Sequence, residues 1–300
     1  MAKSIKKILI PTDFSPTAEV AMNQAAFLAR LLRADLYLVH VLEYNTFSFS
    51  VVPDTPPVLP ARGKLEKIAL QKLQEEAAAI KKDHGIKCKM HVLHGVPETE
   101  ILDFSKKNKI SLIIMGTHGV KGYKEFFIGS NSHRVINISK IPVLTIQKKS
   151  GKAGFNNIVI PIDNSLHSRE KVNMALEIAD VCGSKIHVLG LPDSDEDIDL
   201  LKMRLKVESV EKILKKHKLP FKTSLVSDDN LADAAMNYAK KNKCDLIVIN
   251  TGHESKLTGI FMGPFAKQIV NHSPIPVLSV NPTQGELITP SLSASANPFQ

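Results

Sequence analysis

The sequence predicts an α/β protein of two doubly wound domains, each with a five-stranded parallel sheet and helices on both faces. Short runs that are apolar on both faces alternate along the chain with stretches of helical periodicity, which is the pattern of βαβ units. The motifs of the first half of the 300 residues also recur in the second half. Right-handed crossovers between parallel strands then place helices on both faces of each sheet.

Each element of the first copy is assigned from its local pattern. Apolar runs bounded by turn residues predict strands, and helical periodicity predicts helices. The expected strands are Lys7–Pro11, Asp35–Val41, Lys87–Val92, Ser111–Met115 and Pro142–Ile146. The expected helices are Pro16–Leu32, Leu65–Asp83, Pro97–Lys107 and Ser130–Ile138. Because ligands of such sheets bind beyond the carboxyl ends of the strands, the residues after these strands are the first candidates for a site.

Three segments of the first half recur in the second half. KKILIPTDFS matches NNIVIPIDNS, ISLIIMGTHG matches CDLIVINTGH, and SKIPVLTIQ matches SPIPVLSVN. These matches pair Asp13 with Asp163, Gly116 with Asn250, and Pro142 with Pro276. A repeat of this length indicates two similar domains, which we place at residues 1–149 and 155–281 with a small polar linker between them.

Three further segments lie outside the shared pattern. Tyr44–Gly63 holds four prolines, which oppose regular structure, and it is a lid over the site, an interaction loop or an irregular surface excursion. The acidic segment Asp193–Asp199 of the second copy leads into a helix, whose first turn favours carboxylates. The C-terminal tail, residues 282–300, is rich in Ser, Pro, Asn and Ala, and we expect either little regular structure or an extended arm.

Composition narrows the class of protein. A hydrophobic fraction of 43% without tryptophan supports aliphatic cores. No apolar run reaches the roughly 20 residues that cross a bilayer, and the N-terminus has the pattern of a first strand rather than of a signal peptide. Cys88, Cys182 and Cys244 are scattered and form neither a disulfide framework nor a metal-ligand spacing. Reduced thiols of this kind indicate the cytoplasm.

The net charge of +9 lies in the first half. It is compatible with an anionic ligand, and solvated lysine-rich helix faces account for most of it. Nucleic acid is the rival partner, but the chain has no RNA-binding or DNA-binding motif and no compact Lys/Arg cluster. His91 and His94 form a poor metal pair, because residues three apart on a strand point to opposite faces. We expect no membrane or nucleic-acid partner, and no metal site formed by the protein's own side chains.

The most informative stretch is MGTHGVKGYKEFFIGSNSHRV, with the spacing G-x2-G-x9-G-S at Gly116, Gly119, Gly129 and Ser130. A strand pattern precedes it and a helical pattern follows. Glycines at a strand end let backbone amides approach a ligand, and a helix N-terminus presents free N–H groups with partial positive charge. The stretch suits a phosphate chain. We expect a branched side chain at Gly119 or Gly129 to fill the phosphate space and to resist the backbone conformation.

This spacing resembles the ATP-binding signature of the universal stress protein family. KKILIPTDFSPTAEVAMNQAAFLA is similar to that family's first strand, acidic residue and first helix, and SKIPVLTIQ is similar to its last strand. Because all these pieces recur, the resemblance covers nearly the whole chain. It implies Rossmann-like domains, an adenine nucleotide such as ATP, with or without Mg2+, and a regulatory role in a stress response.

The resemblance places the nucleotide in the first copy. Asp13 would accept hydrogen bonds from an adenine amine or a ribose hydroxyl, or it caps the helix that starts near Pro16. Val41 would contact the adenine ring, or it is plain core. The glycine loop would hold the phosphates with Asn131, while His118 either reaches them or is a solvated loop residue. The expected nucleotide-binding residues are Pro11, Thr12, Asp13, Val41, Met115, Gly116, His118, Gly119, Gly129, Ser130 and Asn131.

The second copy departs from this signature. Asn250 and His253 replace the first two glycines, and Pro264 replaces the serine after Gly263. Proline has neither an N–H nor a hydroxyl, so two phosphate donors are lost together. Asp163 persists, with a helix cap as its expected role. We expect weak or absent nucleotide binding in this copy.

Together these patterns indicate a cytoplasmic regulatory protein, whose nucleotide occupancy biases a conformation or the contact with a protein partner. An interaction protein without nucleotide is one alternative. An enzyme, either a nucleotide hydrolase or a phosphotransferase, is the other. Any ATP hydrolysis would be slow, because no clear base is present; Glu125 is the nearby candidate in the loop. Neither a G-x-S-x-G elbow nor a G-x-x-x-x-G-K-[ST] P-loop occurs.

Within the family, the last strands of two domains pair across a two-fold axis. The matching strands here, Pro142–Ile146 and Pro276–Val280, are both apolar and both expected at a sheet edge. An uncovered apolar edge is a liability that mutual pairing removes. We therefore expect the two copies to pack as an intrachain pseudo-dimer, and we leave open whether two chains form a homodimer.

Overall fold

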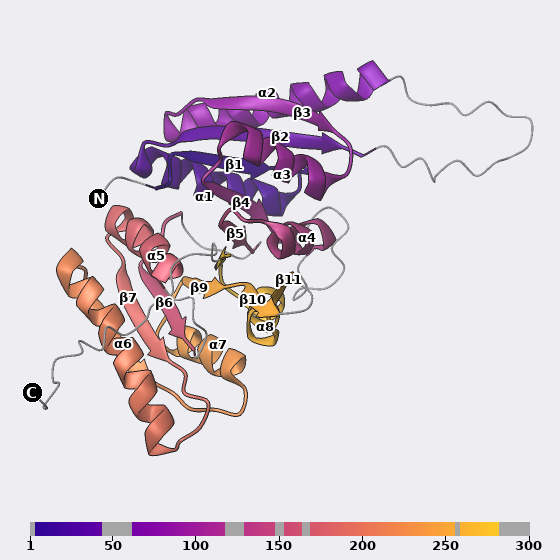
Figure 1. The fold of residues 1–300 in the computed structure, drawn as a ribbon. Helices are drawn as coiled ribbons and strands as arrows, with labels where there is room; N and C mark the ends of the chain where they lie inside the picture. The colour runs from indigo at the N-terminus through magenta and orange to yellow at the C-terminus, as the bar shows by residue number, and fades with distance from the viewer. Residues whose placement is uncertain are drawn as a thin grey trace, which may run out of the picture.

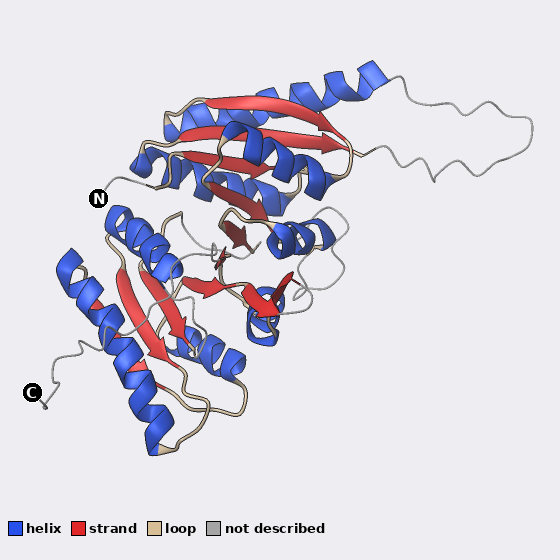
Figure 2. Ribbon diagram, in the orientation of Figure 1, coloured by secondary structure: helices blue, strands red, loops and turns tan. Residues whose placement is uncertain are grey.

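The computed structural model describes residues 4–43, 62–117, 129–147, 153–163, 169–255 and 259–281. Ten strands form one sheet in the order β3-β2-β1-β4-β5-β12-β9-β6-β7-β8, and helices lie on both of its faces (Figure 1, Figure 2). The first five of these strands come from the first copy and the last five from the second. The proline-rich residues 44–61, the loop residues 118–128 with His118, Gly119 and Glu125, and the tail 282–300 lie outside the described residues.

The five expected strands of the first copy are confirmed, and their ends shift by two residues at most. They are β1 (Lys7–Pro11), β2 (Asp35–Leu42), β3 (Cys88–His94), β4 (Leu112–Gly116) and β5 (Val143–Ile146). All four neighbouring pairs are parallel. Because the chain moves outward from β1 to β3 on one side and from β4 to β5 on the other, the switch point lies between β1 and β4.

The four expected helices of the first copy are also confirmed. They are α1 (Pro16–Leu32), α2 (Arg62–His84), α3 (Pro97–Asn108) and α4 (Ser130–Ile138). Successive residues of β1 show which helices cover which face of the sheet. Ile8 and Ile10 belong to the core that also contains residues of α1 and α2, whereas Leu9 belongs to the core that contains residues of α3 and α4. Because successive side chains of a strand point to opposite faces, the sheet separates two apolar cores.

The second copy repeats this arrangement. Its strands are β6 (Asn157–Ile162), β7 (Lys185–Gly190), β8 (Phe221–Leu225), β9 (Leu246–Asn250) and β12 (Val277–Val280). Its helices are α5 (Arg169–Cys182), α6 (Asp197–His217), α7 (Leu231–Lys241) and α8 (Pro264–His272). The acidic segment before α6 leads into its first turn, as expected. None of the helices in the described ranges combines the length and the apolar character needed to cross a bilayer.

One element of the second copy was not expected from the sequence. After β9, the chain forms a two-stranded antiparallel hairpin of β10 (Gly252–Ser255) and β11 (Gly259–Met262). This hairpin stands between β9 and α8, where the first copy has its glycine loop between β4 and α4 (Figure 1). The two copies therefore share their layers but differ in the segment that follows the fourth strand.

The two copies join through their last strands, which confirms the expected pseudo-dimer. β5 and β12 pair in antiparallel orientation, with Leu144 opposite Leu278. Equivalent side chains make equivalent bonds at both ends of this junction. The Gln147 side-chain N–H donates to the Ser273 carbonyl at 3.4 Å, and the Asn281 side-chain N–H donates to the Ser139 carbonyl at 3.1 Å. This reciprocity is what a local two-fold axis requires.

Helices α1 and α5 make a second contact between the copies. The Glu177 carboxylate on α5 accepts hydrogen bonds from the backbone N–H groups of Ser4 at 3.0 Å and Ile5 at 2.9 Å. In the other direction, the Gly154 N–H donates to Oε1 of Gln24 on α1 at 3.0 Å. Buried side chains of both helices belong to one apolar core that runs across the junction. We infer that the two copies are stabilised together.

Replacing Val143 with lysine should destabilise both copies at once. Val143 is 1% exposed and lies opposite Ser279 in the β5–β12 junction. An ammonium group buried there should lower the free energy of unfolding by at least about 2 kcal/mol. Urea unfolding followed by circular dichroism should show one transition at a lower midpoint. Val96→Lys, at a position 53% exposed, is the matched control and should change little. Two transitions, with the second copy unaffected by Val143→Lys, would contradict this account.

Candidate functional site

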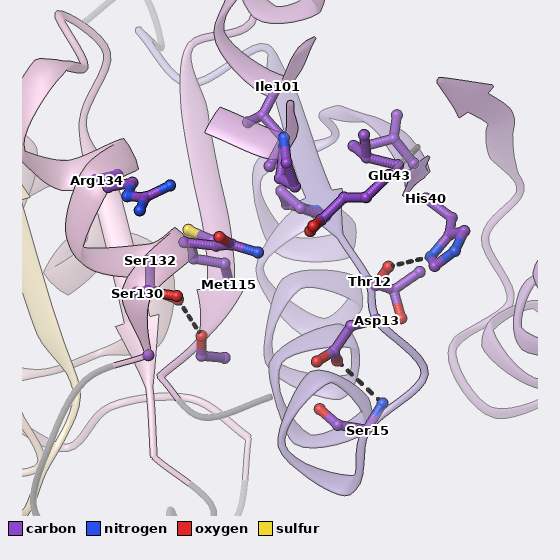
Figure 3. A pocket seen from close by; sticks show the side chains of 17 residues that line it. Thr12, Asp13, Ser15, His40, Glu43, Ile101, Met115, Ser130, Ser132 and Arg134 are labelled. Atoms are coloured by element: carbon purple, nitrogen blue, oxygen red, sulfur yellow. Dashed lines mark hydrogen bonds between the residues drawn. The ribbon is translucent and has the colours of Figure 1, made fainter. Parts of the chain in front are cut away.

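A cavity of about 620 Å3 lies at the carboxyl ends of the first-copy strands (Figure 3). Its walls come from the turn after β1, the end of β2, the start of α3, and the end of β4 with the first turns of α4. Nine of the eleven expected residues line it: Pro11, Thr12, Asp13, Val41, Met115, Gly116, Gly129, Ser130 and Asn131. The other two, His118 and Gly119, lie outside the described residues. The sheet thus brings together segments that are more than a hundred residues apart in the sequence.

Eight further lining residues were missed in the sequence: Ser15, Val39, His40, Glu43, Pro97, Ile101, Ser132 and Arg134. Val39, His40 and Glu43 lie within two residues of Val41. They could have been found by counting two residues on either side of that strand end as candidates for the site. Ser132 and Arg134 could have been found from the helical spacing after Ser130. Nothing in the sequence points to Pro97 and Ile101, because their place depends on how α3 docks on the sheet.

The turn between β1 and α1 is held by the side chains of Asp13 and Ser15. Oδ1 of Asp13 accepts a hydrogen bond from the Ser15 N–H at 3.1 Å (Figure 3), and Oγ of Ser15 accepts one from the Ala18 N–H at 3.2 Å. Ser15 is therefore the N-cap of α1, and the alternative expectation that Asp13 caps this helix is wrong. The turn fixes an exposed Asp13 carboxylate at the cavity wall, where it can accept further hydrogen bonds.

Thr12 connects this turn to β2. Its N–H donates to the Val39 carbonyl at 2.8 Å, and its Oγ1 accepts a hydrogen bond from the Phe14 N–H at 3.0 Å. Nδ1 of His40 donates to the Thr12 carbonyl at 2.8 Å, and the His40 ring packs on Phe14 with centroids 4.4 Å apart. Burial lowers the pKa of His40 below its usual value, so this histidine is neutral near pH 7.

The N-terminus of α4 forms the opposite wall. Oγ of Ser132 donates to the Gly116 carbonyl at 2.7 Å and so ties α4 to the end of β4. The N-cap, Gly129, offers no side-chain cap, and Ser130 and Asn131, which open the helix, line the cavity. Backbone N–H groups and a partial positive charge at such a helix end attract anions.

The two described glycines of the motif differ in what they contribute. A Cβ at Gly116 would lie 3.0 Å from the backbone carbon of Thr17 and 3.0 Å from its Cγ2, so glycine lets β4 approach the start of α1. Gly129 has φ −62° and ψ 150°, which is ordinary extended backbone. The expectation that a branched residue would resist the backbone conformation is therefore wrong for Gly129, and only the steric part of that expectation remains.

The cavity combines apolar walls with polar ends. Val41, Ile101 and Met115 give it apolar surface. Arg134 adds a cation beside the N-terminus of α4, and its guanidinium donates to Oε1 of Glu98 at 3.0 Å. Such a cavity fits a ligand with a flat apolar ring, hydroxyl groups and an anionic group, because each part finds a matching wall.

The corresponding end of the second copy has different chemistry. Asn250 stands in place of Gly116, and neither polar atom of its buried amide has a hydrogen-bond partner among the described residues. Pro264 begins α8, and Ala266 stands in place of Ser132, so the hydroxyl groups of α4 have no counterpart. Lys171 is buried beside this end and donates to the Pro161 carbonyl at 2.6 Å. Burial lowers the pKa of this lysine, with Asp163 nearby acting in the opposite direction.

Neither metal ligation nor thiol chemistry is suggested by the remaining side chains. In the described part of the chain, no three His, Cys, Asp or Glu side chains come together as metal ligands would. Cys88, Cys182 and Cys244 are free thiols. Burial raises the pKa of all three, and that of Cys244 to about 12, which keeps the thiols protonated and unreactive.

A family model matches each copy separately, and curated relatives match about half of the chain. The model of the Universal stress protein family matches residues 4–147 and again residues 154–281. Universal stress protein MJ0531 of Methanocaldococcus jannaschii is 35% identical over 149 residues, covering 48% of this chain and 82% of that protein. Universal stress protein MJ0577 of the same organism is 34% identical over 161 residues, covering 50% of this chain and 99% of that protein. Each of these relatives is thus about as long as one copy.

A solved structure resembles both copies together. A universal stress protein from Archaeoglobus fulgidus DSM 4304 aligns with a TM-score of 0.71 and 18% identity, covering 94% of this chain and 99% of that chain. At this identity the likeness concerns the fold alone. It extends over both halves of the ten-stranded sheet.

Gly116→Ala should destabilise the chain through its contact with Thr17. The new Cβ would meet backbone and side-chain atoms at 3.0 Å, and overpacking of this kind costs ~1–3 kcal/mol. Urea unfolding measures the change. Gly63→Ala in α2 is the matched control, because nothing lies within 4 Å of its Cβ position. If Gly116→Ala were as stable as wild type, the close approach would not be the reason for this glycine.

Proposed function

The chain belongs to the universal stress protein family, and we propose that its first copy binds one adenine nucleotide, ATP or a close relative, as a regulatory ligand. The observation that carries this proposal is the convergence of the acidic turn after β1 and the glycine–serine segment before α4 on one cavity. We assign residues 1–149 to the nucleotide domain, 155–281 to a degenerate partner domain and 282–300 to a tail.

Each wall of the cavity has a role in this proposal. Asp13 accepts hydrogen bonds from the ribose or the adenine amine, and Val41 and Ile101 flank the ring. The N-terminus of α4, with the hydroxyl of Ser130, receives the phosphates. Mg2+ would accompany the phosphates, since it is ordinarily held through them together with water.

A regulatory role agrees better with this cavity than an enzymatic one. Among the described residues, the carboxylates that line it are Asp13, which holds the turn before α1, and Glu43, which follows β2, whereas the phosphates are assigned to the N-terminus of α4. Turnover near ~1 s−1, the low end for ordinary enzymes, would instead favour a nucleotide hydrolase. We place the protein in the cytoplasm, where thiols stay reduced, and its output in a conformation or contact read by a protein partner.

Calorimetric titration with ATP and Mg2+ should give one site per chain. Ser130 offers the phosphates a backbone N–H and a hydroxyl, and Pro264, which stands in its place in the second copy, has neither. Binding at the second copy should therefore be weak or absent. Two equivalent sites per chain would show that the second copy also binds nucleotide. A titration whose heat does not saturate would count against the proposed function itself.

Gly129→Val and Gly119→Val should abolish this binding while leaving the fold intact. Gly129 lines the cavity and tolerates valine in its backbone conformation, so the loss would come from side-chain volume in the phosphate space. Gly263→Val is the matched control, because Gly263 is the N-cap of α8 in the second copy. Circular dichroism checks the fold, and calorimetry checks the affinity. Normal binding by both first-copy variants would place the nucleotide elsewhere.

A further inference from the structure

The carboxyl group of Glu76, on α2, lies behind the turn that carries Asp13. Its Oε1 accepts a hydrogen bond from Oγ1 of Thr12 at 3.2 Å. Its Oε2 is buried and has no hydrogen-bond partner among the described residues. Thr12 is 5% exposed and lines the cavity, whereas Glu76 does not line it. Glu76 is thus one hydrogen bond away from the cavity wall.

Charged and titratable groups surround this carboxyl from every element packed against it. They are Asp13 from the turn after β1, Glu19 from α1, Cys88 from β3 and Lys72 from α2 itself; His40 of β2 bonds the carbonyl of Thr12, the residue that donates to Glu76. Burial raises the pKa of Glu76 to about 7; the hydrogen bond from Thr12 acts in the opposite direction, and Asp13 and Glu19 add to the rise. Both protonation states are therefore populated near neutral pH.

We propose that Glu76 is a positioning residue of the nucleotide site, and that its neutral carboxyl is the form that favours bound nucleotide. This inference rests on the proposed function. A nucleotide brings several negative charges to a cavity that Asp13 already lines, and an ionised Glu76 would add a second carboxylate behind that of Asp13. Like charges disfavour one another, most of all where water is partly excluded. The neutral carboxyl still accepts the hydrogen bond from Thr12, and it adds no charge.

Binding then raises the pKa of Glu76 further and takes up a proton. Affinity is greatest well below pH 7, where Glu76 is neutral in both the free protein and the complex. It falls as the pH rises through about 7 towards the higher pKa of the complex. His40 and Cys88 do not titrate between pH 7 and pH 8, because burial lowers the pKa of the histidine and raises that of the thiol.

Calorimetry with ATP and Mg2+ between about pH 6.5 and 8, in two buffers of different ionisation enthalpy, measures the affinity and the protons taken up. The proteins to compare are wild type, Glu76→Gln and the matched control Glu75→Gln. Glu75 is the exposed neighbour and accepts a hydrogen bond from Gln71 at 3.0 Å. Ionisation of ATP itself is common to all three proteins, so the differences between them report on Glu76.

If binding raises the pKa by one unit, wild type and Glu75→Gln should lose about fourfold in affinity relative to Glu76→Gln as the pH rises from about 6.5 to 8. They should also take up about half a proton more than Glu76→Gln near pH 7.5. Glu76→Gln should bind more tightly than wild type at pH 8. A variant that merely disturbed the fold would weaken binding at every pH and would not change the proton count.

The same pH dependence and proton uptake in wild type and Glu76→Gln would overturn this inference and leave the proposed function standing. Binding by none of the three proteins would overturn both.

Thermal unfolding without nucleotide gives an independent check. Because the native pKa is raised, the stability due to this carboxyl is complete below its usual value of 4.5 and is lost as the pH rises through about 7. Glu76→Gln should thus be the more stable protein at pH 8 but not at pH 4. Stabilities that differ equally at both pH values would show that Glu76 does not titrate in this range, and would overturn the inference.

Discussion

The antiparallel pairing of β5 with β12 determines how the rest of the chain is arranged. Each of these strands would be the apolar edge of a five-stranded sheet, and Leu144 and Leu278, which face each other there, are fully buried. Pairing removes both edges and creates a local two-fold relation, which the bonds of Gln147 and Asn281 repeat in opposite directions. Helices α1 and α5 are then brought into contact over one shared core.

The two copies share the same sheet and helix layers, but they differ in the residues at the carboxyl ends of their strands. In the first copy, Gly116 lets β4 approach α1, and Ser132 ties α4 to the end of β4, so the cavity lies between a carboxylate and a helix N-terminus. In the second copy, Asn250 and Pro264 replace the glycine and the serine, and the β10–β11 hairpin follows. Packing in the sheet depends on the apolar strands, which both copies keep. The chemistry at the strand ends can therefore diverge without loss of the fold.

The sequence predicts most of the fold, because buried parallel strands are continuous apolar runs and their helices have a clear period. It also predicts that Asp13 and Ser130 lie close together, since both follow parallel strands near one switch point. Features that depend on the docking of helices are not visible in it. Ile101 reaches the cavity because α3 packs on one face of the sheet, and Glu76 reaches Thr12 because α2 packs on the other. The hairpin after β9 was missed because its residues lack a strong strand pattern.

Photoaffinity labelling with 2-azido-ATP, followed by peptide mapping, tests most directly whether the first copy holds an adenine nucleotide. If the first copy holds the nucleotide, the labelled peptides should come from residues 35–43 or 97–117, which contribute cavity walls, and the label should be lost when unmodified ATP is added. Labelling confined to residues 155–281, or labelling that ATP does not displace, would contradict a nucleotide site in the first copy.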